Sequence, residues 1–437
     1  MSETSKVIHD PIHGSIRADG PYLQVLDRHE MQRLRGIKQL GLGNMVFPGA
    51  NHTRFEHSLG VYHLAGRMAS ALELSEEDAS AVKMAGLLHD VCHTPLSHTT
   101  EEIFEYATGK DHMEMAEGLI KGRVRTNLQR DDDLFGGLPA ISEILEENGI
   151  SSGKVCDLIM HPEQKEGSLD AFSGGKRAGH FSSKDFIHQI IHGPVDADQM
   201  DYLVRDAHYT GVAHGKADIE RLIGTMRVNN DRIVIEKGGM AAAEGLMVAR
   251  SLMHSSVYFH RTVRIAKMML MKSIEASSID IGEIYLWNDS DLMERLMGEG
   301  GVSSTIARSV QNRILYKNVL TIFSEDASED MLSYLSEYVS YPKRKQLEKE
   351  ISDRAGVDVS DVAVDIPPAP ILLSKMSIGK TDVSILDPEG KVKTLTRLSP
   401  LAKALQSRDT FGWSLQISSP EKHREAVLKA SKKILSL

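Results

Sequence analysis

The spacing of apolar and polar residues along the chain predicts a protein built mostly from helices. Thr53, followed three residues later by Glu56, has the pattern of a capping box, and apolar residues at helical spacing come after it. Ser75 precedes three acidic residues, which favour the first turn of a helix, so a second helix is expected from there to His89-Asp90. A third helix is expected from about residue 111.

Turn-forming residues separate the other expected elements. Residues 1–25 are expected to be extended, and 162–185, rich in Gly, Ser and charge, are expected to form a surface loop. Residues 226–237 have the pattern of a β-hairpin. Further helices are expected from just before 192 through 198–203, over 240–276 as one long helix, and over 290–352.

The character of the sequence changes near residue 353. Pro367-Pro368-Ala369-Pro370 predicts a rigid linker, short strand-like runs follow at 382–386 and 413–417, and a basic helix is expected at the end. We therefore expect a mainly α fold in two parts, a helical core over 1–350 and a small α+β lobe over 353–437.

Composition excludes several classes of protein. Of the 437 residues, 41% are apolar and 26% charged, as in globular domains. A net charge of −10 argues against binding to duplex nucleic acid, which needs a basic surface, but allows a small anion held by local cations. Two cysteines, and no apolar run near the ~18–20 residues of a membrane span, predict a cytoplasmic protein without membrane segments.

Four residues within about 50–210 are candidate metal ligands: His57, His89, Asp90 and Asp198. The adjacent pair ends an apolar helical run, and two more histidines follow it at once. Imidazole nitrogen and carboxylate oxygen together suit a divalent cation such as Mn, Fe, Ni, Zn or Mg, and this set leaves coordination positions open for water and a phosphate oxygen. The alternative is that these residues are ordinary core or capping residues.

Other polar residues share helical faces with the candidate ligands or with one another. Arg54 lies one turn before His57, where its guanidinium can bind phosphate or, alternatively, pair with an acid such as Glu56. Arg250, His254 and Tyr258 recur every four residues, so they form either the wall of a polar pocket or a solvated helix edge.

A second group of titratable residues follows the His-Asp pair and consists of His93, His98, Glu101 and His112. Histidine can act as a general acid near neutral pH, and Glu101 could orient and protonate His112. The alternative is that each of these histidines is a hydrogen-bonded structural residue.

Several long motifs in the same order resemble those of the HD-domain phosphohydrolase superfamily, and more narrowly its deoxynucleoside triphosphate (dNTP) triphosphohydrolases. The resemblance covers roughly residues 5–275 and rests on these segments: 6–14, 33–41, 46–50, 53–60, 89–98 and 198–206.

The resemblance implies a role for each matched residue. The metal ligands would be the four residues named above, and His112 would be the catalytic acid, supported by Glu101. Phosphate would be held by Arg54, His98, Tyr202 and Arg250. The sugar would contact Gln39 and Leu40, with Tyr202 excluding a 2′-hydroxyl and Asp206 binding the 3′-hydroxyl, while His254 and Tyr258 line the pocket. The implied reaction converts a dNTP to deoxynucleoside and triphosphate.

The chain departs from the animal members of the family at two positions. Gln199 stands where those enzymes have Lys, so one phosphate cation is missing and a smaller phosphate ester becomes a plausible substrate. His9 stands where they have Asn, at a nucleotide-binding subunit interface. Four positions nevertheless match those that read an activating guanine nucleotide: Val7, Asp27, Gln32 and Arg35. If they are more than ordinary surface residues, they imply a nucleotide-activated homo-oligomer, a dimer or tetramer.

Three hypotheses follow from these residues. The leading one is a metal-dependent dNTP triphosphohydrolase. The second is a phosphohydrolase acting on another nucleotide or a phosphate monoester, motivated by Gln199. The third is a nucleotide-sensing regulator without turnover. A nuclease is the weakest alternative because the chain is acidic.

Overall fold

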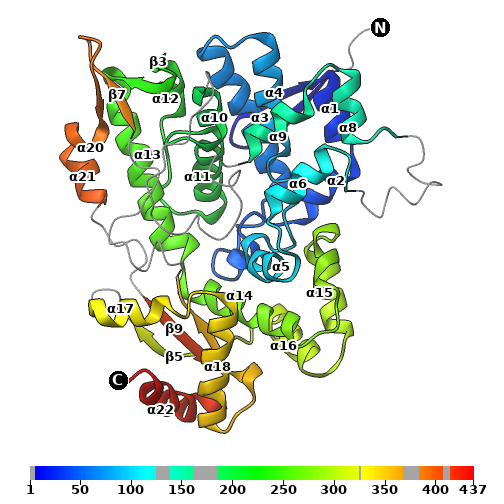
Figure 1. The fold of residues 1–437 in the computed structure, drawn as a ribbon, viewed down its shortest axis with the longest axis vertical. Coiled ribbons are helices and arrows are strands. Elements are labelled where there is room, and N and C mark those ends of the chain that lie inside the picture. Colours follow the sequence, from blue (N-terminus) through cyan, green and yellow to red (C-terminus); the bar gives the residue numbers. More distant parts are fainter. Residues whose placement is uncertain (1–4, 125–137, 161–184, 324–325, 368–382, 407–413) are drawn as a thin grey trace.

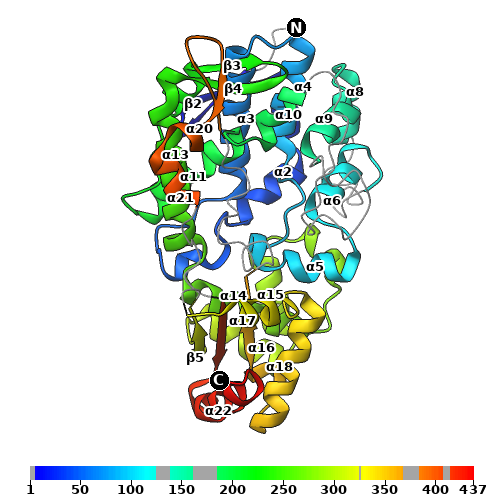
Figure 2. The same cartoon turned by 60° about the vertical axis from the view of Figure 1, so that its left-hand side comes forward.

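The computed structural model describes residues 5–124, 138–160, 185–323, 326–367, 383–406 and 414–437, which form a large helical core with a smaller lobe at one end (Figure 1). The expected mainly α fold is confirmed. One extended cluster of buried apolar side chains fills the core, and a separate cluster fills the lobe. Figure 2 shows the lobe from a second side, with α18 and α22 on its outside.

The N-terminal segment is a β-hairpin followed by a short helix. Strands β1 (Ser5–Asp10) and β2 (Gly14–Asp19) pair antiparallel, which confirms the expected extended backbone for these residues. The expectation was wrong for 20–25, because α1 (Gly20–Leu26) begins there with Pro21 in its first turn. Proline is accepted at that position because the first amides of a helix have no partner within the helix.

Helix α3 (Arg54–Ala71) is central to the core and packs on α4 (Glu76–Leu88) and α11 (Ala197–Thr210). Both expected helix starts are confirmed. The Glu56 carboxylate accepts from the Thr53 backbone N–H at 2.6 Å and from its hydroxyl at 2.8 Å, and the Ser75 hydroxyl accepts from the Asp78 N–H at 3.2 Å. These caps satisfy amides that would otherwise lack partners.

Shorter helices surround this centre. The helix expected near 111 is confirmed as α6, with Asp111 as its N-cap. The expected loop at 162–185 lies, apart from its last residue, outside the described residues. The shorter helices of the core are α2 (His29–Arg33), α5 (Glu101–Thr108), α6 (His112–Ile120), α8 (Ile141–Glu147), α9 (Ser152–Ile159), α12 (Ile219–Gly224), α15 (Asp289–Gly298) and α16 (Gly301–Gln311).

Two helices expected to be continuous are broken. The segment around 192–203 forms α10 (Asp185–His192) and then α11, because Pro194 cannot continue a helix and the Asp196 carboxylate caps a new one by accepting from Gln199 N–H at 2.7 Å. The segment 240–276 forms α13 (Met240–Met253), the π-helical turn η8 (His254–Tyr258) and α14 (Arg261–Glu275).

A four-stranded sheet lies at the end of the core away from the lobe. The expected hairpin is confirmed as β3 (Met226–Asn229) and β4 (Arg232–Glu236). Strand β7 (Ser384–Leu386) pairs parallel to β4, and β8 (Val392–Thr394) completes the order β3-β4-β7-β8. The next helices are α20 (Leu395–Leu398) and α21 (Pro400–Gln406), and α21 packs on α13. Residues 383–406 therefore belong spatially to the core.

The lobe is built on a three-stranded antiparallel sheet with the order β5-β9-β6. Its strands are β5 (Lys317–Ile322), β6 (Ala363–Asp365) and β9 (Leu415–Ser419), and its helices are α17 (Glu329–Ser336), α18 (Tyr341–Ala355) and α22 (Arg424–Ile434). The expectation of helices throughout 290–352 was wrong for β5, whereas the final basic helix is confirmed as α22. The expected proline linker lies beyond Pro367 outside the described residues, and the division at 350/353 stays a prediction.

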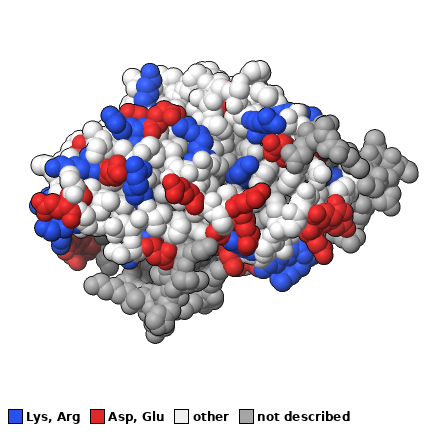
Figure 3. All heavy atoms as spheres, turned by 90° about the horizontal axis from the view of Figure 1, so that it is seen from above, with Lys and Arg blue, Asp and Glu red and all other residues white. Residues whose placement is uncertain are grey.

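Charged residues are mixed on the surface. On the core face that Figure 3 shows, basic and acidic side chains alternate over short distances. Within the described residues, no helix combines the length and apolar character needed to cross a membrane.

Candidate active site

The four candidate metal ligands converge where α3, α11 and the end of α4 meet. His57 Nε2 lies 3.0 Å from Asp198 Oδ1 and 3.6 Å from Asp90 Oδ2, and His89 Nε2 lies 3.4 Å from the same Asp90 atom. All but Asp198 are buried. The fold thus brings together residues about 140 positions apart in sequence, and their role as ligands of one ion stays a prediction.

The histidine hydrogen bonds suit a cation at this point. His89 Nδ1 donates to the Gly86 carbonyl at 2.9 Å, so its Nε2 presents a lone pair, and that buried atom has no hydrogen-bond partner among the described residues. His57, His89 and Asp90 offer ligand atoms that all lie close together. A group of this kind can hold a divalent metal.

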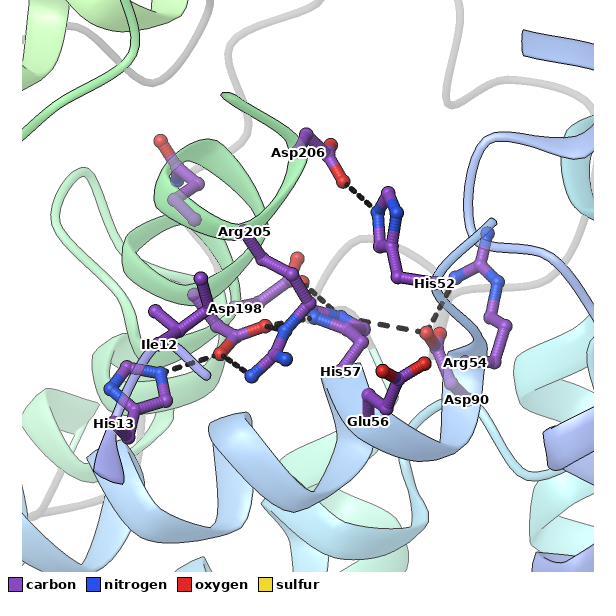
Figure 4. A network of polar contacts seen from close by, with 12 residues as sticks. Ile12, His13, His52, Arg54, Glu56, His57, Asp90, Asp198, Arg205 and Asp206 are labelled. Carbon is purple, nitrogen blue, oxygen red and sulfur yellow. Dashed lines mark hydrogen bonds and ion pairs between the residues drawn. The ribbon is translucent and has the colours of Figure 1, made fainter. Parts of the chain in front are cut away.

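Asp201 fixes the orientation of His57. Its buried carboxylate accepts from His57 Nδ1 at 2.7 Å, from His13 Nε2 at 2.7 Å and from two nitrogens of Arg205 at 2.8 and 2.9 Å. Figure 4 shows His13, His57 and Arg205 around this position. Arg205 also donates to Asp10 at 2.7 Å. With Nδ1 engaged in this way, His57 turns Nε2 toward Asp90 and Asp198.

Charge in this network is unevenly distributed. Burial lowers the pKa of His57, but hydrogen bonds to Asp198 and Asp201 outweigh burial and raise that pKa to about 10. Burial likewise raises the pKa of Asp201, but Arg205 and the two histidines hold it well below its usual range. The carboxylates therefore favour positive charge beside them, which a metal can supply.

Arg54 lies beside the candidate ligands. Its guanidinium donates to Asp90 and, at 2.9 Å, to the Ser97 hydroxyl, and it lies 3.4 Å from His98 Nε2. Glu56 instead binds Thr53 and the hydroxyl of Tyr209. Arg54 thus points into the site, where a buried guanidinium can bind a phosphate oxygen.

The candidate acid group forms one contiguous cluster. Glu101 accepts from His98 Nδ1 at 2.7 Å and binds His112, which stacks on His93 with ring centroids 4.1 Å apart. Burial lowers the pKa of His112, but the Glu101 carboxylate outweighs it and the pKa is raised. Burial, Arg54 and His112 hold the pKa of His93 well below its usual value. His112 is therefore the group in this cluster suited to donate a proton.

The remaining candidate sugar and phosphate residues lie on α11, on α13 and the π-helical turn that follows it, and at Gln39 and Leu40 in the segment before α3. Tyr258 donates to Asp206 at 2.8 Å, and its ring packs against those of Tyr202 and His254. Arg250 donates to the Gln199 amide oxygen at 3.3 Å. Gln39 is buried, Leu40 is half-buried, and both precede α3. The expected stripe thus faces α11.

The four candidate activator residues lie on the N-terminal hairpin and the helices that follow. Val7 is exposed, and Asp27 pairs with Lys6 at 3.3 Å. Arg35 donates to the Gln32 amide oxygen at 2.8 Å and lies over the Phe55 ring. These residues are accessible at the surface, and their role stays a prediction.

Sequence reasoning missed several polar residues that the fold brings to the site. Asp10, His13, Asp201 and Arg205 lie in the matched motifs but received no role, and His52 was not considered. The signal for Asp201 and Arg205 was their separation by one helical turn on α11.

A separate cavity of about 420 Å³, lined partly by Arg261, Arg313 and Lys317, lies outside the expected site.

Comparison with known proteins agrees with this geometry. The family model of the HD domain matches residues 54–159, and that of the HD associated region matches 217–437. An uncharacterized protein of Methanocaldococcus jannaschii is 32% identical over 95% of this chain and 79% of its own length. The human deoxynucleoside triphosphate triphosphohydrolase SAMHD1 is 30% identical over 78% of this chain and 58% of its own length.

A solved structure has a similar fold over nearly the whole chain. A hypothetical protein from Aquifex aeolicus, 27% identical, superposes with a TM-score of 0.69 over 98% of this chain and 100% of its own. The resemblance stated from the motifs is thereby confirmed. The chain belongs to the HD-domain phosphohydrolases, a family of hydrolases whose HD domains bind divalent metals, and it is related to the deoxynucleoside triphosphate triphosphohydrolases.

Proposed function

We propose that this protein hydrolyses dNTPs to deoxynucleoside and triphosphate with a bound divalent metal. The observation that carries the proposal is the convergence of His57, His89, Asp90 and Asp198 beside the buried guanidinium of Arg54. The relatives named as dNTP triphosphohydrolases support the same choice of substrate.

The four ligands would hold the metal, which when bound would polarise the phosphate and lower the pKa of the attacking water. Arg54, His98, Tyr202 and Arg250 would bind phosphate oxygens. His112, kept protonated by Glu101, would donate a proton to the departing sugar oxygen. His93, neutral and stacked on His112, would hold that ring in place.

The sugar would be recognised on the other side of the site. Gln39 and Leu40 would contact it from the segment before α3, and Asp206 would bind the 3′-hydroxyl. Tyr202 would leave no room for a 2′-hydroxyl, while His254 and Tyr258 line the pocket.

Gln199 favours a second candidate function. Its amide is buried, donates to the Gly193 carbonyl at 3.0 Å and to Asp196 at 2.9 Å, and accepts from Arg250. It therefore adds no cation of its own and instead holds Arg250. One fewer positive charge favours a substrate with fewer phosphates, so hydrolysis of another nucleotide or a phosphate monoester is the alternative.

Regulation forms a separate part of the proposal. Val7, Asp27, Gln32 and Arg35 would read a guanine nucleotide at an interface of a homo-oligomer. If the protein binds such a nucleotide but turns nothing over, it is a sensor. The exposure of Val7, Asp27 and Arg35 supports a contact with another molecule.

The deciding experiment combines metal analysis with product analysis. We expect the purified protein to contain a divalent metal and to convert mixed dNTPs, with Mg or Mn and with GTP present, to deoxynucleosides and triphosphate separated by HPLC. The Asp198→Ala variant should lose this activity. Release of inorganic phosphate would favour the monoesterase, and tight nucleotide binding with unchanged dNTPs would favour the sensor.

A further inference from the structure

His52 lies directly before the cap of α3 and connects two sides of the candidate sugar site. Its side chain is fully buried, and Nε2 lies 2.7 Å from Asp206 Oδ1 (Figure 4). Its ring stacks on Tyr209, with centroids 4.5 Å apart and planes 12° from parallel. Buried against a flat aromatic partner, the imidazole is held in one orientation.

The second contact to Asp206 comes from the opposite side. The Tyr258 hydroxyl donates to Oδ2 at 2.8 Å, so each carboxylate oxygen accepts one hydrogen bond from the protein. Since a carboxylate can accept about four hydrogen bonds, two lone-pair sites are left for a ligand hydroxyl. His52 and Tyr258 thus fix the direction of Asp206 without saturating it.

The backbone of His52 makes the other connection. Its carbonyl accepts from the Gln39 N–H at 3.0 Å. The Gln39 side chain is buried, and its amide oxygen has no hydrogen-bond partner among the described residues. This buried amide oxygen is therefore free to accept a hydrogen bond from water or from a bound molecule.

We propose that His52 is a positioning residue for the sugar subsite, holding Asp206 through its side chain and Gln39 through its backbone so that the site selects substrates with a 3′-hydroxyl. This inference rests on the proposed dNTP hydrolysis. His52 does not touch the reacting atoms. His52 instead keeps the Asp206 carboxylate pointing in one direction. Without His52, that carboxylate would turn toward solvent or other donors.

The test compares a dNTP with its 2′,3′-dideoxy analogue, which lacks only the 3′-hydroxyl. The matched variants are His52→Gln, which keeps an N–H donor, and His52→Met, of similar size but without one. In His52→Met, the kcat/KM for the dNTP divided by that for the dideoxy analogue should fall about 10- to 100-fold, because a hydrogen bond to the Asp206 carboxylate is lost. In His52→Gln, most of this ratio should be retained. Turnover of the dideoxy analogue should barely change.

Tyr209→Phe is the control, because it keeps the stacked ring and leaves the ratio unchanged. Thermal unfolding and metal content show whether the variants are folded. If the His52→Met variant does not fold, the His52→Asn variant replaces it, because the asparagine amide is too short to reach Asp206.

Equal losses on both substrates, or an unchanged ratio in His52→Met, would overturn the inference while the proposed function stands. Wild-type protein that does not distinguish the two substrates would overturn it as well. Wild-type protein that leaves dNTPs intact would overturn the proposed function itself, and the inference with it.

Discussion

At the scale of single residues, the candidate metal centre depends on groups that do not touch the metal position. Asp201 accepts four hydrogen bonds from His13, His57 and Arg205 and is completely buried. A carboxylate behind a ligating histidine fixes the ring and its tautomer. Through Arg205 and Asp10 the same network includes the N-terminal hairpin.

Asp201→Asn should weaken metal binding by about 10- to 100-fold, because an amide can still contact His57 but no longer favours the Nδ1–H tautomer. Metal titration of metal-free protein measures this directly, without an activity assay. Glu220→Gln, which removes an exposed carboxylate paired with Arg67, should bind metal like the wild type. Equal affinity in both variants would count against a supporting role for Asp201.

Glu101→Gln should shift the pH dependence of kcat. Burial lowers the pKa of His112 and the Glu101 carboxylate raises it, so removing that charge lowers the pKa. The acid must be protonated, and activity falls as pH rises through its pKa. The alkaline limb of kcat, measured at saturating metal, should therefore move to lower pH, whereas Glu105→Gln on the exposed side of α5 should leave it in place.

The residues of the candidate site differ in how far sequence alone could identify them. His57, His89, Asp90 and Asp198 were predictable as a group because their donor atoms define a chemistry. For Asp201 the sequence offered only its spacing of one helical turn from Arg205, and for His52 it offered no pattern. Only the fold reveals that these side chains support other residues of the site. The roles of the candidate residues stay predictions.

At the scale of elements, the approach of α3 to α11 brings His57 to Asp198. Gly60 on α3 permits it, because a Cβ there would lie 1.9 Å from Asp201 Oδ1 and 2.6 Å from an Arg205 nitrogen. Gly66, farther along the same helix, would place a Cβ 3.4 Å from the Lys83 side chain, an ordinary contact.

Gly60→Ala should therefore lower the free energy of unfolding by about 1–3 kcal/mol through overpacking, and should weaken metal binding by displacing Asp201. Gly66→Ala should instead stabilise the protein by up to about 1 kcal/mol, because alanine favours the helix interior. Chemical denaturation of both variants provides the comparison. A stable Gly60→Ala variant with normal metal affinity would contradict the close approach.

Elements whose signals are local were predicted well. The starts of α3 and α4 depend on side chains within three residues of the cap, and the turn between β3 and β4 depends on Asn230 and Asp231, both with positive φ. The break at Pro194 was missed although Gly193-Pro194 is a local breaking signal, because apolar spacing continues across it. The π-helical turn at His254–Tyr258 was missed for the same continuity of apolar spacing. Strand β5 was missed because its partner β9 lies about a hundred residues later.

At the scale of the whole molecule, partly buried ion pairs connect the lobe to the core. Arg344 on α18 donates to both oxygens of Glu102 on α5 at 2.7 and 2.8 Å, and Arg264 on α14 pairs with Asp365 on β6. Glu101, the partner of His112, directly precedes Glu102. The lobe therefore helps to hold the turn of α5 that carries the candidate acid group.

Arg344→Met should lower the free energy of unfolding by about 1.5–3 kcal/mol, since it removes two hydrogen bonds to a charged group. Amide hydrogen exchange in α5 should accelerate, and turnover should fall. Arg354→Met, an exposed position on the same helix, should change stability by no more than about 0.5 kcal/mol. Unchanged exchange in α5 would show that the lobe does not restrain it.

The strand order β5-β9-β6 has a consequence for synthesis of the chain. Strands β5 and β6 do not pair with each other; each pairs only with β9, within the described residues. Because β9 begins only at Leu415, its two partner strands, β5 and β6, are synthesised well before the centre of this sheet exists. The sheet of the lobe therefore cannot form completely until β9 has been synthesised. A truncated nascent chain therefore exposes two unpaired strands, which makes it a natural target for chaperones and proteases.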